Sequence, residues 1–197
     1  MPDVSLTTFV DFLATTGRKR IQIVEKAKKE DNTPYDPITD FYKRLREGIV
    51  SFEHCSLTEE DLLDLPNTLS DHKKKKNYPP AIKGYLKWRK KVAIEKSKNV
   101  KGEFSHDELR VRINPEVSLR VNGKRTAMKL YFKQQTLAAN RLDLITHLMW
   151  FGMPHGYSDG VALMDTRRNK LIGIKDYDPK IQLLLEAEAE TFLKLWA

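Results

Sequence analysis

Residues 109–133 read LRVRINPEVSLRVNGKRTAMKLYFK, and apolar and polar side chains alternate through most of this stretch. Successive side chains of a β-strand point to opposite faces, so the alternation predicts three strands, at residues 109–113, 117–121 and 126–133. Asn122-Gly123 predicts a tight hairpin between the second and third strands, because both residues tolerate a positive φ. We expect the three strands to be antiparallel neighbours in one sheet.

The rest of the chain is dominated by helical periodicity. Apolar residues recur every three or four positions in several segments, which predicts helices at residues 5–14, 18–30, 38–52, 56–65, 80–96, 136–151 and 180–196. Two further strands are predicted at residues 161–165 and 171–174. From residue 80 onward the order is α-βββ-α-ββ-α, which predicts an α+β fold with a mainly antiparallel sheet.

Three regions are predicted along the chain. Short connections join the helices of residues 1–70, so we expect a compact helical subdomain there. Residues 71–101 are expected to form a basic linker and a connecting helix, and residues 102–197 an α+β domain. Within the linker, Lys73–Lys76 is expected to be extended and mobile because like charges repel one another, and Pro79-Pro80 is expected to open the helix.

The positive charge of the chain is concentrated in the linker region. Between Asp71 and Val100 lie eleven Lys or Arg residues and only two acidic ones, so this region accounts for all of the formal net charge of +8. Local positive charge favours binding to a polyanion. Tyr78, Tyr85 and Trp88 lie among the lysines, and two interpretations stay open: they stack on bases, or they anchor the helix in a core.

A second basic surface follows if the three central strands are neighbours, because their cationic side chains then share one sheet face. The leading hypothesis is a nucleic-acid-binding protein that contacts phosphates without reading sequence. Its predicted contact residues are Lys73, Lys74, Lys75, Lys76, Lys83, Lys87, Lys90 and Lys91 from the central region, with Arg110, Arg112, Arg120, Lys129 and Lys133 from the sheet face.

An alternative is a metal-dependent nuclease. The order of a helix, three strands, a helix and another strand resembles that of the restriction-endonuclease-like core. That resemblance implies carboxylates near the second and third strands and a lysine two residues after the second carboxylate, which hold a divalent metal and assist attack by water. Lys129 matches the lysine, but Ala127 stands where the acid belongs. The candidate catalytic residues are therefore a displaced set, comprising Glu116, Lys129, Asp165 and His155.

The remaining predictions concern partners and location. No glycine-rich phosphate loop, HExxH, GxSxG or CxxC motif is present, so no cofactor or metal is expected, except Mg²⁺ under the nuclease alternative. A protein-interaction adaptor with an acidic protein partner is the third alternative, and the sequence sets no oligomeric state. A single cysteine, Cys55, and the absence of a secretory signal or membrane-spanning run predict a cytoplasmic protein that does not enter membranes.

Overall fold

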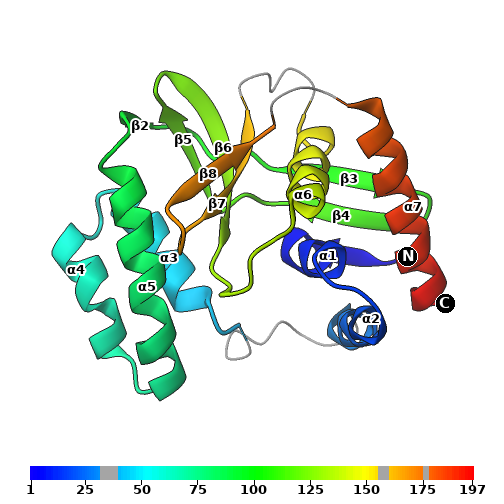
Figure 1. The fold of residues 1–197 in the computed structure, drawn as a ribbon, viewed down its shortest axis with the longest axis horizontal. Coiled ribbons are helices and arrows are strands. Elements are labelled where there is room, and N and C mark those ends of the chain that lie inside the picture. The colour runs from blue at the N-terminus through cyan, green and yellow to red at the C-terminus, as the bar shows by residue number, and fades with distance from the viewer. Residues whose placement is uncertain (32–39, 155–159, 175–177) are drawn as a thin grey trace.

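The computed structural model describes residues 1–31, 40–154, 160–174 and 178–197 (Figure 1). The first part of the chain is mostly helical, with β1 (Asp3–Ser5), α1 (Leu6–Leu13), α2 (Arg18–Asp31), α3 (Lys43–Glu53), α4 (Glu59–Asp64), the 3₁₀ helix η1 (Leu65–Thr68) and α5 (His72–Arg89). The second part contains β2 (Ile94–Lys96), β3 (Gly102–His106), β4 (Leu109–Ile113), β5 (Val117–Val121), β6 (Lys124–Tyr131), α6 (Ala139–Phe151), β7 (Val161–Asp165), β8 (Lys170–Gly173) and α7 (Pro179–Trp196). The predicted α+β class is confirmed.

The strands form two sheets. A three-stranded sheet has the order β1-β4-β3, and a five-stranded sheet has the order β2-β5-β6-β7-β8. Pairing is antiparallel except between β1 and β4 and between β6 and β7, where α6 provides the crossover. Asn122 and Gly123 both have positive φ in the turn between β5 and β6, which confirms the predicted hairpin.

The prediction that three consecutive strands are neighbours is wrong for β4. This strand pairs with β1 and β3, whereas β5 pairs with β2 and β6. The chain changes sheet at Asn114-Pro115, where proline has no N–H to continue a ladder. The partners β1 and β2 are only three residues long, and too short to show the alternation that identified the other strands.

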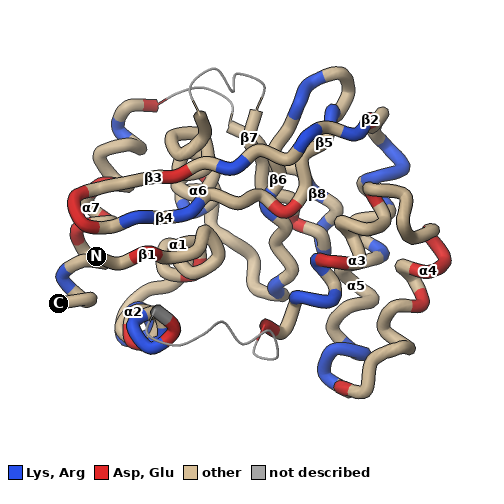
Figure 2. The backbone as a smooth tube through the Cα atoms, turned by 180° about the vertical axis from the view of Figure 1, so that it is seen from behind, with Lys and Arg blue, Asp and Glu red and all other residues tan. Residues whose placement is uncertain are grey.

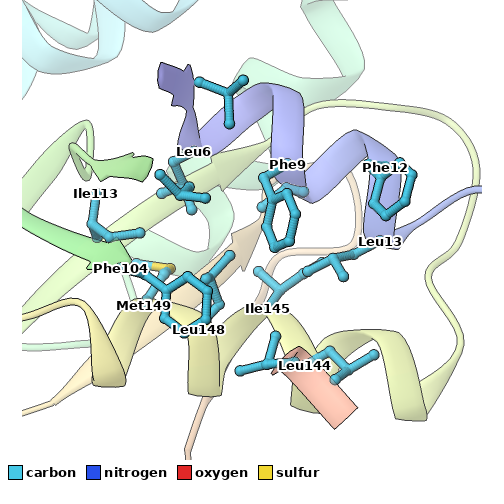
Figure 3. Close-up of a cluster of buried hydrophobic side chains, with 14 of the residues drawn as sticks. Leu6, Phe9, Phe12, Leu13, Phe104, Ile113, Leu144, Ile145, Leu148 and Met149 are labelled. Carbon is cyan, nitrogen blue, oxygen red and sulfur yellow. The ribbon is translucent and has the colours of Figure 1, made fainter. Parts of the chain in front are cut away.

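Two hydrophobic cores lie on opposite faces of the five-stranded sheet. One includes apolar side chains of α1, α2, α6 and α7 together with the three-stranded sheet, and Figure 3 shows part of it around Phe9 and Leu148. The other includes α3, α4 and α5. The helices of residues 1–70 are therefore divided between two cores, which corrects the prediction that they form one compact subdomain.

The basic run at Lys73–Lys76 is helical, which corrects the prediction of a mobile linker. Helix α5 begins at His72, and the Asp71 carboxylate accepts hydrogen bonds from the Lys73 and Lys74 amides at 2.7 and 3.2 Å. This cap satisfies amides that the first turn leaves without a partner. Pro79 and Pro80 lie inside the helix and remove two of its backbone hydrogen bonds. Tyr78, directly before them, is fully buried in the core that holds α5.

Glu188 of α7 forms ion pairs that connect α7 with α2 and α6. A substitution at Glu188 therefore tests how these three helices pack together. The Glu188 carboxylate lies 2.8 Å from Arg20 of α2 and 2.8 Å from Arg141 of α6. Burial acts to raise the pKa of Glu188, but the hydrogen bonds from the two arginines outweigh it and lower the pKa below its ordinary value. Glu188→Ala is expected to lower the free energy of unfolding by about 2 kcal/mol at neutral pH.

This contribution should depend on pH. Because the folded-state pKa of Glu188 is lowered, its stabilisation is present above the unfolded-state pKa and is lost as pH falls through the folded-state pKa. Urea unfolding of the wild type and of Glu188→Ala should show a difference at neutral pH that shrinks in strong acid. An equal difference at both pH values would contradict this assignment.

Among the described residues, no helix combines the length and apolar character needed to cross a membrane.

Candidate nucleic-acid interface

Helix α5 buries one side and exposes the other. Its buried residues are Tyr78, Ala81, Ile82, Gly84, Tyr85, Leu86 and Trp88. Most of them belong to the core that also contains α3 and one face of the five-stranded sheet. The apolar residues therefore fix which side of α5 faces solvent, and the lysines occupy what remains.

A buried carboxylate holds the C-terminal half of α5 against α3. Glu53 accepts a hydrogen bond from Tyr85 Oη at 2.8 Å and one from Arg89 Nε at 3.1 Å. Burial, with the nearby Glu53 charge, raises the pKa of Tyr85 well above its ordinary value. Tyr85 therefore stays protonated and donates to Glu53 throughout the physiological pH range.

The turn between β7 and β8 holds the middle and the N-terminal half of α5. Arg167 Nη2 donates to the backbone oxygen of Asn77 at 2.9 Å, and its Nε donates to the Phe132 oxygen at 2.6 Å. At Gly84 the helix approaches so closely that an added Cβ would lie 1.9 Å from the Thr166 oxygen. The exposed face of α5 is therefore presented by a rigidly packed helix.

Five lysines form a line along that exposed face, which we call the lysine stripe: Lys73, Lys76, Lys83, Lys87 and Lys90. Their spacings of three, seven, four and three residues place them within an arc of about 100° on one side of the helix. With a rise of 1.5 Å per residue, the stripe is about 25 Å long. All five are exposed.

Most of the stripe has no internal counter-charge. Lys90 forms an ion pair with Glu59 at 2.6 Å. The other four lysines form no ion pair with any residue in the described ranges: Lys73, Lys76, Lys83 and Lys87. Many other Lys and Arg side chains of the protein do form ion pairs with acidic residues. Figure 2 shows Lys and Arg at both ends of α5, and the acidic positions of the neighbouring helix α4 beside it. These four ammonium groups are available to an external anion.

The other predicted lysines of this region lie off the stripe. Lys74 is half-buried, with its ammonium 5.9 Å from the centre of the Phe41 ring. Lys75 is exposed on a different side of the helix, and Lys91 is exposed just after the helix ends. These three lysines add positive charge beside the lysine stripe but are not part of it.

The predicted basic sheet face does not exist, because its five residues do not share a face. Arg110 and Arg112 are on β4 of the other sheet, where they pair with Glu103 and Asp3. Arg120 on β5 pairs with Glu95 of β2 at 3.5 Å. The remaining two residues contact helix α1 or a buried acid, as described next.

Lys129 and Lys133 lie under or beside α1. Lys129 is buried in contact with Glu116 and donates to Thr7 Oγ1 at 2.8 Å, while Lys133 pairs with Asp11 at 2.5 Å. The alternation in β6 correctly placed Lys129 on the face opposite Met128. The error was to expect that face to be open, whereas helices cover both faces of this sheet.

The β5–β6 hairpin contributes one basic residue, Lys124, that the sequence analysis did not predict as a contact. The Asn122 amide donates to the Ala93 oxygen at 2.9 Å, and the Ala93 amide donates to Asn122 Oδ1 at 3.0 Å. These bonds hold the hairpin tip beside the chain that leaves α5 at Lys91. Lys124 at the tip is exposed, and its cross-strand partner Val121 packs in the core of α5, so Lys124 extends the basic surface in that direction. Its position directly after the Asn-Gly turn was the available signal.

The candidate nuclease residues only partly converge. The carboxylate of Glu116, just before β5, contacts Lys129 and accepts a hydrogen bond from the Leu130 amide at 2.9 Å. Asp165 at the end of β7 is paired with Arg168 at 3.0 Å. Within residues 1–31, 40–154, 160–174 and 178–197, no three His, Cys, Asp or Glu side chains gather to hold a metal ion. His155 lies outside the described residues.

The lysine stripe of α5 and the buried Glu116–Lys129 ion pair are the two features of the structure that suggest a function. Comparison with protein-family models finds no match, and a search of curated proteins finds no significant match to this sequence.

Proposed function

We propose that this protein binds nucleic acid by contacting backbone phosphates through the lysine stripe of α5. The observation that carries the proposal is that four exposed lysines, Lys73, Lys76, Lys83 and Lys87, which form no ion pair with any described residue, lie in a line about 21 Å long. A polyanion with regularly spaced charges is the complementary ligand for such a line. Lys91 and the hairpin residue Lys124 supply additional positive charge at one end.

Binding of this kind is driven by release of counterions. Each phosphate that a lysine neutralises contributes about −0.9 to the slope of log K against log salt concentration for a DNA duplex. Phosphate contacts set position and affinity but carry no base identity. The protein is therefore expected to bind sequences of different composition with similar affinity.

Neutralising the stripe should abolish most of this binding. The variant Lys73→Gln, Lys76→Gln, Lys83→Gln and Lys87→Gln is expected to bind a labelled DNA duplex at least about a hundredfold more weakly at low salt, because four phosphate contacts are lost. Fluorescence anisotropy measures the affinity, and circular dichroism checks that the variant is folded.

A matched variant controls for net charge. Lys19, Lys26, Lys180 and Lys194 are exposed on α2 and α7, at the opposite end of the molecule from α5 (Figure 1). Changing these four to Gln removes the same charge and should lower the affinity only slightly. Equal losses in the two variants would contradict a binding site on α5.

A second candidate function is metal-dependent phosphodiester cleavage. It is favoured by the contact between Glu116, before β5, and Lys129, in β6, on a sheet where α6 links the parallel strands β6 and β7. Against it, Glu116 and Asp165 are each engaged by a cation. Cleavage of DNA or RNA with Mg²⁺ or Mn²⁺ that disappears in Glu116→Gln would support this function. Failure to cleave several substrates would leave phosphate binding as the activity.

A further inference from the structure

We infer that the ligand of the lysine stripe is a double-stranded nucleic acid rather than a single strand. This inference rests on the proposed function and specifies its substrate class. It follows from what the exposed face of α5 lacks as well as from what it carries.

The first argument is the burial of the two tyrosines and the tryptophan of α5. Tyr78 and Tyr85 are 0% exposed and Trp88 is 5% exposed. The Tyr78 hydroxyl donates to the Phe41 oxygen at 2.6 Å, and the Tyr85 hydroxyl is bound to Glu53. Both rings are therefore held inward by packing and by hydrogen bonds, so neither can stack on a base without breaking the core.

The aromatic side chains that surround α5, Phe41, Tyr42 and Phe52, are half-buried against the same core. Among the described residues, the one aromatic side chain that ranks as an exposed large hydrophobic is Trp150 of α6, at 37%. Helix α6 covers the face of the five-stranded sheet opposite α5. Base stacking on aromatic side chains contributes about 1–3 kcal/mol per base to single-strand binding. Among the described residues, the aromatic side chains next to α5 are buried or half-buried, so this surface offers less of that contribution than an open stacking platform does.

The second argument is rigidity. The stripe lies on a helix fixed by Glu53, Arg167 and the close contact at Gly84. A duplex is stiff over about 150 base pairs and presents one negative charge per about 1.7 Å of its axis. A duplex can therefore bind to a rigid line of lysines without losing conformational entropy of its own. A flexible single strand loses conformational entropy when it is ordered, and here no stacking offsets that loss.

The test compares ligands with the same number of phosphates. A mixed-sequence DNA duplex, an RNA duplex of equal length and unstructured DNA and RNA single strands are titrated by fluorescence anisotropy at the same low salt concentration. At least one duplex is expected to bind about tenfold or more tightly than either single strand. The comparison between the two duplexes then identifies whether the phosphates of DNA or RNA fit better.

The possible failures are distinguishable. Single strands that bind as tightly as the duplexes, with binding lost in the stripe variant, would overturn this inference and leave the proposed function intact. No binding to any of the four ligands, or binding that the stripe variant does not weaken, would overturn the proposed function itself. Duplex preference that disappears in the stripe variant supports both.

Discussion

Gly84→Ala is expected to lower the free energy of unfolding by about 3 kcal/mol or more, because overpacking against backbone cannot relax. The added Cβ would lie 1.9 Å from the Thr166 oxygen and 3.1 Å from the Arg167 oxygen, both backbone atoms of the turn after β7. Either α5 or this turn must move, and Arg167 also holds Asn77 and Phe132.

A loss of stability in Gly84→Ala would be opposite in sign to the effect of helix propensity alone. Alanine is a better helix former than glycine by about 1 kcal/mol, so without the close contact the substitution would stabilise α5. Urea unfolding followed by circular dichroism measures the change. Lys83→Ala, on the exposed face next to Gly84, is the matched control and should change stability by less than about 0.5 kcal/mol. A Gly84→Ala protein as stable as the wild type would show that α5 does not dock on this turn.

Glu116→Ala is expected to cost about 3–5 kcal/mol of stability, because removing one partner of a buried ion pair leaves the other charge uncompensated. The Lys129 and Glu116 side chains are only 6% and 8% exposed. After the substitution Lys129 keeps Thr7 as a hydrogen-bond partner but loses its counter-charge, and the Leu130 amide loses its acceptor.

A second substitution separates the charge effect from other causes. Lys129→Met removes the stranded ammonium, so the double variant Glu116→Ala and Lys129→Met is expected to recover a large part of the lost stability. Urea unfolding of the two single variants and the double variant gives the coupling. If Glu116→Ala alone leaves stability unchanged, the pair does not have the structural role assigned to it, and its role in cleavage gains weight.

The strands of the fold could be predicted because their signal is local. The alternation from Val117 to Val121 and through β6, with the Asn122-Gly123 turn, identifies a hairpin without knowledge of the rest of the chain. Which strand pairs with which is not local. Strand β4 pairs in parallel with β1, whose three residues lie more than a hundred positions earlier. No periodicity within either segment encodes that partnership.

The same reasoning explains which parts of the candidate site were predicted. Lysines at helical spacing identify the exposed side of α5, because the apolar positions between them must be buried. The period of β6 put Lys129 on the correct face but did not reveal that α1 covers that face, since the contact with Thr7 joins residues far apart in the chain. The hydrogen bonds between Asn122 and Ala93, which bring the hairpin tip to the end of α5, are likewise long-range.

The salt dependence of duplex binding tests the central claim most directly. For the wild-type protein, a plot of log K against log salt concentration is expected to have a slope of about −4 from the stripe, steeper if Lys91 and the hairpin lysine also make contact. The variant with Lys73, Lys76, Lys83 and Lys87 changed to Gln should lose about 3.6 units of that slope, which corresponds to four phosphate contacts. The same slope in the variant and the wild type would contradict the account, because the lysine stripe would then make no contact with phosphate.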